Sequence, residues 1–401
     1  MKSTLFLLGA SLVLAACSDP FPLQPRPLRP ATASLDVSPE QQVFERYVAL
    51  GTSNSMGVQS AGIFATGQRA AWPAQLAAHV DVQFSLPLVQ DPGCGPPLLP
   101  PLAADAILVG AFGNDLVTAV MNTCAPLRDG VTLPTNSVAI SGAKAHDALY
   151  STIESETAQN PRTGMLYSRV LSPGQTQVTA MLAQHPTFVS VELAANEVLP
   201  ASTGRISAMT PYESWTADYD QIIELVKTTG ARAVLVGVPH NAANFPSIRR
   251  AREFFDQWPY LLTLGIKVSL NCYFSSNYVF VPGYVLTLLA SRPTTATCAD
   301  VPGAADYVLT PSEVNAINAR MAQLNAHIQA KANENGYAYF SLEAVYGLAK
   351  PRFNMADVLF SNAPFGAYVS LDGVHPTALG QSVLAAAAVQ AINARYGLAI
   401  P

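Results

Sequence analysis

The 401-residue chain has few charged side chains and no excess of cations. Asp, Glu, Lys and Arg make up only 12% of its residues, and the formal net charge is −5, whereas typical soluble proteins have about 25% charged residues. A nucleic-acid-binding surface needs a concentration of Lys and Arg, so we exclude nucleic acid as a partner. Hydrophobic residues make up 50% of the chain, which excludes a disordered or fibrous protein and predicts a large buried core.

The chain also lacks long hydrophobic runs and clustered metal ligands. Beyond the N-terminus no apolar run is long enough for a membrane span, which needs about 18 residues or more, so we expect the body of the protein to be soluble. Its 6 histidines are scattered, and none pairs with another histidine or a cysteine at the spacing typical of zinc sites. We therefore predict neither a metal nor a cofactor.

Residues 1–16 have the features of a lipoprotein signal peptide. Lys2 provides a positive start, an apolar run from Leu5 to Leu14 follows, and Leu14-Ala15-Ala16-Cys17 resembles the bacterial lipobox. That resemblance implies cleavage before Cys17 and acylation of its thiol. Because Ser18 stands where an inner-membrane retention aspartate could be, we expect a lipid-anchored protein of the bacterial cell envelope, at the outer membrane. An ordinary signal peptide followed by an incidental cysteine is the alternative.

Residues 17–37 contain five prolines and little apolar periodicity, which predicts an extended tether. Disulfides persist in the oxidising compartment that the signal peptide implies, and four further cysteines are present. Three pairings are possible. We favour Cys94–Cys124 and Cys272–Cys298, because each pair brackets one loop-rich stretch, and free buried thiols are the alternative.

Short apolar runs alternate with amphipathic helical patterns through the rest of the chain. The expected strands cover residues 46–50, 137–140, 187–193, 233–238 and 337–340, and the expected helices cover residues 72–80, 175–184, 219–229, 311–335 and 376–395. This alternation predicts a three-layer α/β/α fold with a parallel sheet, whose functional groups collect at the carboxyl ends of the strands. Residues 81–134 and 241–310 are rich in Pro and Gly, so we interpret them as insertions in a single domain over residues 38–401.

One short motif near the C-terminus suggests the chemistry. Asp372-Gly373-Val374-His375-Pro376 combines a carboxylate with an imidazole three residues later, and chance would produce about 0.02 such matches in a chain of this composition. Asp372 can accept from one ring nitrogen of His375 while the other nitrogen faces a hydroxyl nucleophile. Pro376 is expected at the first position of the following helix. Ser53, in Gly51-Thr52-Ser53 directly after the first strand, is the candidate nucleophile, although chance alone supplies about 1.8 Gly-x-Ser triplets.

Four blocks of the sequence together resemble the SGNH or GDSL family of serine ester hydrolases. The blocks are Tyr47–Ser53, Val138–Ala143, Val189–Glu197 and Asp372–Pro376. The resemblance implies a flavodoxin-like sheet, a catalytic triad of Ser53, Asp372 and His375, and an oxyanion hole formed by the amides of Ser53 and Gly142 with the side chain of Asn196. It also implies a carboxylic ester hydrolase, an esterase or lipase, that acts on a small-molecule, lipid or glycan ester.

Three positions depart from the family pattern. Thr52 stands where the family often has Asp, Ala194 where it has Gly, and Glu197 where it has Asp. A competing block, Phe112-Gly113-Asn114-Asp115, matches the asparagine pattern better, but it precedes the glycine block and so reverses the family order. We therefore assign Asn196 and keep Asn114 as the second candidate.

The expected reaction is a two-step acyl transfer through an acyl-enzyme, on lipid, short acyl or acetyl esters. Deacetylation of polysaccharide or peptidoglycan is a variant of the same chemistry. A different class of function is a non-catalytic surface lipoprotein that binds a glycan or lipid on the same scaffold. The aromatic stretch 273–280 is expected to pack inside the second insertion, with the lining of a substrate pocket as its alternative.

Overall fold

The computed structural model describes residues 37–95, 98 and 123–401. Within them a parallel sheet forms in the order β1 (Tyr47–Gly51), β2 (Phe188–Glu192), β3 (Arg232–Gly237) and β9 (Ala338–Ser341). Residues 137–140 extend the sheet beside β1, because Val138 N donates to Ala49 O at 2.9 Å and Ile140 N to Gly51 O at 3.0 Å. Counted along the chain, the spatial order is 2-1-3-4-5, which is flavodoxin-like. The predicted α/β fold with a parallel sheet is therefore confirmed.

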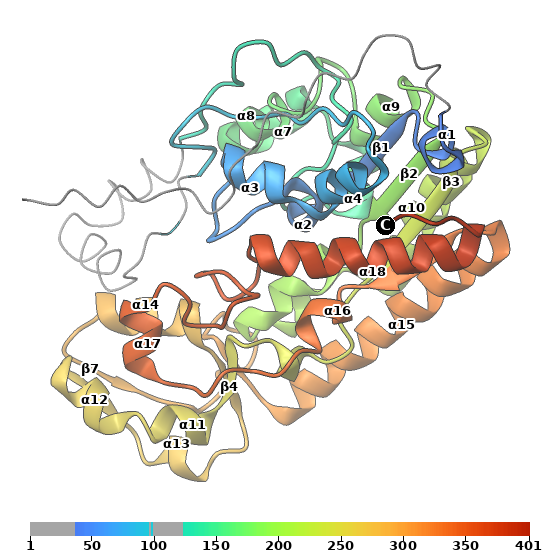
Figure 1. Ribbon diagram of the computed structural model, residues 1–401. Coiled ribbons are helices and arrows are strands. Elements are labelled where there is room, and N and C mark those ends of the chain that lie inside the picture. The colour runs from blue at the N-terminus through green and yellow to red at the C-terminus, as the bar shows by residue number, and fades with distance from the viewer. Residues whose placement is uncertain (1–36, 96–97, 99–122) are drawn as a thin grey trace, which may run out of the picture. The chain divides into compact units, whose positions relative to one another are not determined.

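Helices cover both faces of the sheet (Figure 1). On one face Val48 and Leu50 belong to a core with α6 (Ala145–Tyr150), α9 (Gln177–Leu182), α10 (Tyr212–Thr228) and α15 (Pro311–Asn335). On the other, Tyr47 and Ala49 belong to a core with α4 (Trp72–Val80) and α18 (Ala378–Tyr396). Successive strand residues point to opposite faces, so a sheet covered on both sides needs continuous apolar runs. Every residue of β1 and β2 is buried accordingly.

The predicted helices differ from the observed ones mainly at their ends. α4 and α15 have the predicted bounds, whereas α10 begins seven residues before the expected Tyr219. α18 begins at Ala378 after the N-cap Thr377, so the prediction that Pro376 is its first residue is wrong. The reason is a short antiparallel pairing with the preceding residues: His375 O accepts from Ser370 N at 2.8 Å and Thr377 N donates to Tyr368 O at 3.0 Å, which keeps this segment extended.

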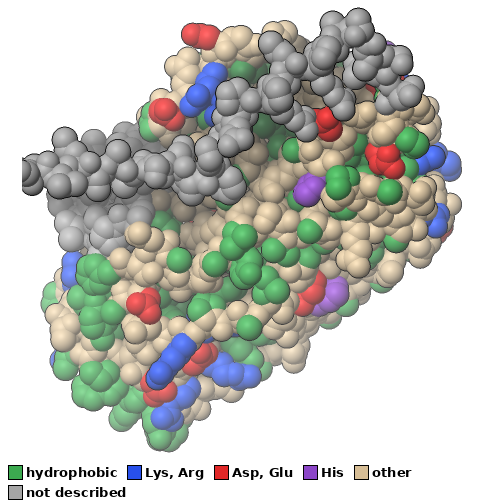
Figure 2. Space-filling view, viewed as in Figure 1, with side chains coloured by type: hydrophobic (Ala, Val, Ile, Leu, Met, Phe, Trp, Pro, Cys, Tyr) green, Lys and Arg blue, Asp and Glu red, His purple; other side chains and the backbone are tan. Residues whose placement is uncertain are grey.

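Residues 241–310, which lie between β3 and α15 in the chain, contain small sheets of their own. Strands β4 (Ile248–Arg250), β6 (Tyr278–Phe280) and β8 (Val308–Leu309) pair antiparallel, and β5 (Ile266–Val268) pairs with β7 (Thr294–Ala296). The helices of this segment are α11 (Ala251–Phe255), α12 (Trp258–Thr263), α13 (Asn271–Phe274) and α14 (Val281–Ala290). The expectation that the aromatic stretch packs inside the insertion is wrong for Phe274, whose exposed fraction is 80%. Figure 2 shows hydrophobic side chains on the outer surface of this part of the molecule.

Both predicted disulfides, Cys94–Cys124 and Cys272–Cys298, are present.

The other helices among the described residues are short. They are α1 (Pro39–Val43), α2 (Ser53–Met56), α3 (Ala65–Ala70), α7 (Ile153–Gln159), α8 (Pro161–Tyr167), α16 (Glu343–Tyr346) and α17 (Met355–Phe360), with 3₁₀ turns η1 (Ala195–Glu197), η2 (Leu199–Thr203), η3 (Ile206–Ala208) and η4 (Ala242–Asn244).

In the part of the chain that the structure describes, no helix combines the length and apolar character needed to cross a bilayer. The predicted signal peptide, Cys17, nearly all of the tether and Asn114 lie outside the described residues.

Candidate active site

Ser53 is the first residue of α2, directly after the carboxyl end of β1. The turn between them requires Gly51, since a Cβ atom there would lie 2.5 Å from Ser55 Oγ. From the C-terminal helix α18, Gln381 Nε2 donates to Asn54 O at 3.0 Å and Gln381 Oε1 accepts from Trp72 N at 3.0 Å. Ser53 is 5% exposed, and its amide, like the first amides of any helix, has no partner inside the helix.

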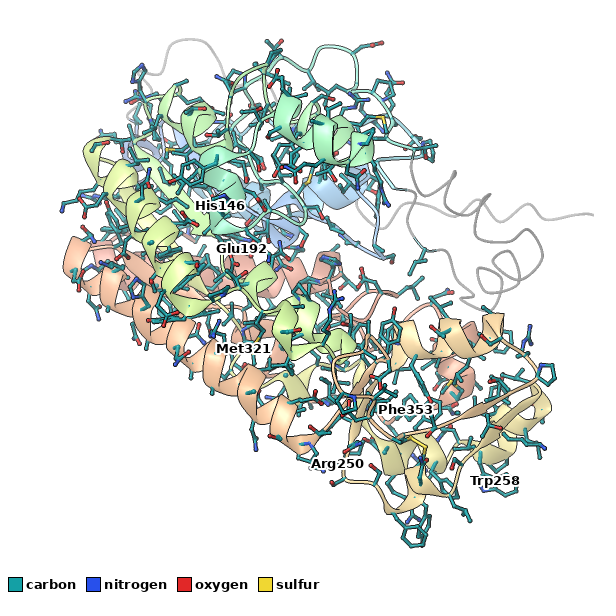
Figure 3. All side chains as sticks on the ribbon, turned by 180° about the vertical axis from the view of Figure 1, so that it is seen from behind. His146, Glu192, Arg250, Trp258, Met321 and Phe353 are labelled. Atoms are coloured by element: carbon teal, nitrogen blue, oxygen red, sulfur yellow. A yellow bond between two sulfur atoms is a disulfide. The ribbon has the colours of Figure 1, made fainter. Side chains whose placement is uncertain are left out.

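A buried carboxylate at the end of β2 stabilises the same turn. Glu192 accepts hydrogen bonds from Thr52 N at 3.0 Å, from Thr52 Oγ1 at 2.8 and 2.9 Å, and from Ser55 Oγ at 3.1 Å. Burial raises the pKa of Glu192, and these hydrogen bonds oppose the rise. Figure 3 shows Glu192 in the interior of the molecule. Sequence analysis missed this residue, although a lone acid at the end of an otherwise apolar strand is a signal, because a buried carboxylate needs partners.

Asp372 and His375 form the hydrogen-bonded pair that their spacing predicts. Asp372 Oδ2 accepts from His375 Nδ1 at 2.7 Å and from Ala61 N at 2.6 Å, and Asp372 Oδ1 accepts from the amides of Val374 and His375 at 2.8 Å each. Burial alone would raise the pKa of Asp372, but the charge of His375 and these hydrogen bonds outweigh it and lower the pKa to about 2. An ionised Asp372 can only accept, so Nδ1 carries a hydrogen and a neutral His375 keeps the Nε2 lone pair free.

Gly142 and Asn196 follow the two strand segments that flank β1. Gly142 has a φ of +84°, in the left-handed region that favours glycine, and its amide donates to no other described residue. Asn196 lies in η1 after β2, and its Nδ2 donates to Ala143 O at 2.8 Å. The neighbouring Glu197 accepts from Ala145 N at 2.9 Å. These two bonds tie η1 to the loop that carries Gly142.

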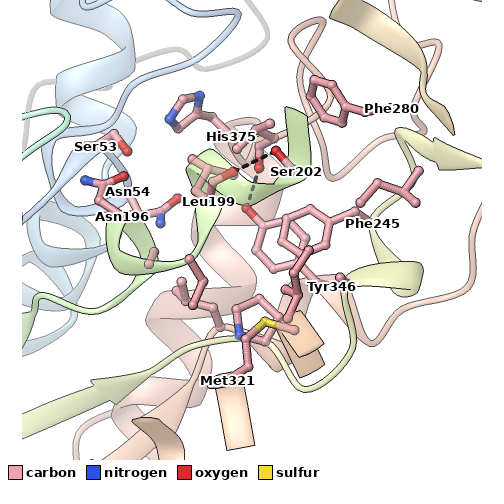
Figure 4. A pocket seen from close by; sticks show the side chains of 18 residues that line it. Ser53, Asn54, Asn196, Leu199, Ser202, Phe245, Phe280, Met321, Tyr346 and His375 are labelled. Atoms are coloured by element: carbon pink, nitrogen blue, oxygen red, sulfur yellow. Dashed lines mark hydrogen bonds between the residues drawn. The ribbon is translucent and has the colours of Figure 1, made fainter. Parts of the chain in front are cut away.

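One pocket and an adjoining hollow bring the predicted residues together at the carboxyl edge of the sheet. Ser53, Asn196 and His375 line the pocket, while Gly142, Asn196 and His375 line the hollow. Figure 4 shows Ser53 and His375 near one end of the pocket and Met321 near the other. No hydrogen bond joins Ser53 Oγ to His375. Most of the pocket wall is apolar, and it includes Val198, Leu199, Phe245, Ile248, Phe280, Ile317, Met321 and Leu342.

The structure accommodates the three residues that depart from the family pattern. Thr52 makes the hydrogen bonds to Glu192 described above. Ala194 has a φ of −141°, a value that does not require glycine. The Glu197 carboxylate reaches the amide of Ala145, and burial raises its pKa. The departures therefore leave the groups around the pocket in place.

The described residues contain no group of three or more His, Cys, Asp or Glu side chains that could hold a metal ion. The polar groups at the pocket include the hydroxyl of Ser53, an imidazole paired with a carboxylate, and amide donors. Such a set can perform proton transfer and stabilise an oxyanion without a metal.

Three solved structures resemble this chain. A protein described as a putative GDSL-like lipase from Parabacteroides merdae is 11% identical to this chain, and the TM-score is 0.34. The aligned region covers 86% of this chain and 95% of the Parabacteroides protein. An extracellular lipase from Streptomyces rimosus is 17% identical, with coverages of 87% and 98% and a TM-score of 0.36. A mutant acetyl-xylooligosaccharide esterase from Geobacillus is 12% identical, with coverages of 86% and 93% and a TM-score of 0.32. No family model and no curated protein sequence matches the chain.

Proposed function

We propose that this chain is a serine ester hydrolase of the SGNH type that acts on esters with an apolar acyl group. The observation that carries the proposal is the oriented imidazole: the ionised, buried Asp372 fixes His375, and His375 and Ser53 line the same pocket. A hydroxyl at the start of a helix beside a fixed imidazole is the arrangement that nucleophilic catalysis requires.

In this mechanism Nε2 of His375 takes the proton of Ser53 Oγ, and Oγ attacks the ester carbonyl carbon. The oxyanion accepts hydrogen bonds from the amides of Ser53 and Gly142 and from the remaining N–H of Asn196 Nδ2. His375 then donates its proton to the leaving alcohol oxygen. Water attacks the acyl-enzyme with His375 again as the base, which returns Ser53 and releases the acid.

The pocket wall favours a hydrocarbon acyl chain over a sugar. The described part of the wall consists mostly of aliphatic and aromatic side chains and includes no Asp, Glu, Lys or Arg, whereas a sugar would require many polar partners to replace its water. The adjoining hollow contains Lys144, Ser202 and Thr203 and is the place for the alcohol part of the ester. We therefore favour lipid or short acyl esters over acetylated polysaccharide.

A fluorophosphonate probe tests the proposal directly. We expect a single adduct on the peptide that contains Ser53, with none in Ser53→Ala, while Ser202→Ala, which removes another hydroxyl of the pocket wall, retains the label. An adduct on a different serine, or no adduct in a protein shown to be folded by circular dichroism, contradicts the proposal. The second of these outcomes would favour a non-catalytic glycan- or lipid-binding protein on the same scaffold.

We also propose that Cys17 anchors the protein in the bacterial cell envelope, at the outer membrane. The lipobox-like Leu14-Ala15-Ala16-Cys17 supports this, and each buried acyl CH₂ would contribute ~0.8 kcal/mol to membrane binding. Growth with an alkyne fatty acid should label the wild-type protein but not Cys17→Ser, and the label should fractionate with the outer membrane. An unlabelled wild-type protein contradicts the anchor, and a label in the inner membrane contradicts the location.

A further inference from the structure

Asn54 places an unpartnered carboxamide beside the candidate nucleophile. It follows Ser53 in the chain, lines the same pocket and is only 5% exposed. Its Oδ1 is buried and has no hydrogen-bond partner, and among the described residues its Nδ2 has none either. Buried polar groups without a partner are uncommon, because leaving one unpaired costs the full desolvation penalty of the group.

The other polar side chains of the pocket wall have partners within the protein. Asn196 donates to Ala143 O at 2.8 Å, Ser202 Oγ donates to Leu199 O at 2.7 Å, Tyr346 Oη donates to Val374 O, and His375 binds Asp372. Two of these bonds are drawn in Figure 4. Apart from the Ser53 hydroxyl, the Asn54 carboxamide is thus the one side-chain polar group on the described wall that has no hydrogen-bond partner within the protein.

We propose that Asn54 selects acyl groups that carry a hydroxyl on the second or third carbon. This inference rests on the proposed ester hydrolase function and narrows its substrate class to hydroxyacyl esters. A neutral partner is favoured, because none of the described residues that line the pocket is an Asp, Glu, Lys or Arg that could balance a charge. A hydroxyl fits, since it both donates and accepts and can pair with either end of the carboxamide.

The place of Asn54 in the chain limits where this hydroxyl can be. Consecutive Cα atoms lie about 3.8 Å apart, so the side chain of Asn54 reaches only the part of an acyl group that lies a few bonds from the carbonyl held at Ser53. The pocket has about 50 Å³ of unfilled space, and the χ2 torsion of Asn is soft. A turn about the Cβ–Cγ bond brings the carboxamide to face a bound acyl chain, while the apolar wall contacts the rest of that chain.

Two matched pairs of p-nitrophenyl esters test the proposal. The 3-hydroxybutanoyl ester is compared with the 3-methylbutanoyl ester, and the 2-hydroxybutanoyl ester with the 2-methylbutanoyl ester, so that a methyl group replaces the hydroxyl at nearly constant shape. For at least one pair, kcat/KM of the wild-type protein should favour the hydroxy ester about tenfold or more. Asn54→Leu should reverse that preference and hydrolyse the methyl ester. Asn333→Leu, which makes the same change at an exposed position of α15, should keep the wild-type ratio.

The outcomes separate this inference from the proposed function. If Ser53 takes the fluorophosphonate label and the methyl esters are hydrolysed, but neither hydroxy ester is preferred, the selectivity of Asn54 is refuted and the ester hydrolase stands. If Asn54→Leu still prefers the hydroxy ester, the selection by Asn54 is refuted as well. Should Ser53 take no label in folded protein, the proposed function fails, and the inference fails with it. The wild-type ratio alone is decisive if Asn54→Leu does not fold.

Discussion

Replacing Asp372 by Asn removes the carboxylate that orients His375, and the structure gives the size of the effect. The lowering of the Asp372 pKa from 3.8 to about 2 corresponds to about 2 kcal/mol of stabilisation by the ionised form, at about 1.36 kcal/mol per pKa unit. Because the folded-state pKa is the lower one, this stabilisation is fully present above the unfolded pKa near 4 and is lost as the pH falls through 2.

Urea unfolding of the wild-type protein and Asp372→Asn at pH 5 and at pH 2 measures this contribution. The difference in free energy of unfolding between the two proteins should shrink by about 2 kcal/mol from the higher to the lower pH. Asp129→Asn, which removes an exposed carboxylate, is the control and should follow the wild type. Parallel pH curves for the wild type and Asp372→Asn would refute the argument that His375 keeps Asp372 ionised.

The same variant should lose ester hydrolysis. An amide at residue 372 can donate to Nδ1 of His375 and thereby place the ring hydrogen on Nε2, where it cannot accept the proton of Ser53. We expect kcat to fall about 10⁴-fold, since this change of tautomer is among the most damaging in triad enzymes. A fall of less than tenfold would show that His375 does not depend on this carboxylate.

Three further substitutions address the oxyanion site, the turn before Ser53 and the second insertion. Asn196→Ala should lower kcat by about 10²–10³-fold in an ester assay, because one oxyanion donor is lost. An unchanged kcat would exclude Asn196 as an oxyanion donor. Glu192→Ala should lower the free energy of urea unfolding by roughly 3–5 kcal/mol, because buried donors of Thr52 and Ser55 lose their acceptor, whereas a loss below 1 kcal/mol would contradict that role. Cys272→Ser opens a disulfide loop with a sequence separation of 26 and should lower the free energy of urea unfolding by about 3 kcal/mol. An unchanged urea midpoint would refute the stabilising role of this disulfide.

The sequence predicted those parts of the fold whose signals are local. Thr310, Pro311 and Glu313 form the start of α15 through a capping box with proline at its first position, and such a pattern can be recognised from four residues. The buried runs of β1 and β2 are equally local, because a strand covered on both faces is mostly apolar, although Ser190 and Glu192 interrupt the run in β2. The pairing of Asp372 with His375 followed from their spacing of three.

What depends on contacts between separate segments could not be predicted. The start of α18 is set by the pairing of residues 375–377 with residues 368–370, which lie close in the chain but give no helix signal near Pro376. Glu192 acts on Thr52 and Ser55, 140 and 137 residues away. For the aromatic stretch 273–280 the sequence left burial and the lining of a pocket open, and only the folded structure shows that Phe280 lines the pocket.

The two hydrogen bonds of Gln381 have a consequence for the order in which the protein becomes active. They join the last long helix, α18, to the backbone beside Ser53 and to α4, across 327 and 309 residues of chain. A growing polypeptide that ends before residue 372 has neither the Asp372–His375 pair nor the two hydrogen bonds of Gln381. The pocket beside Ser53 can therefore be completed only after the chain has been made through its final long helix.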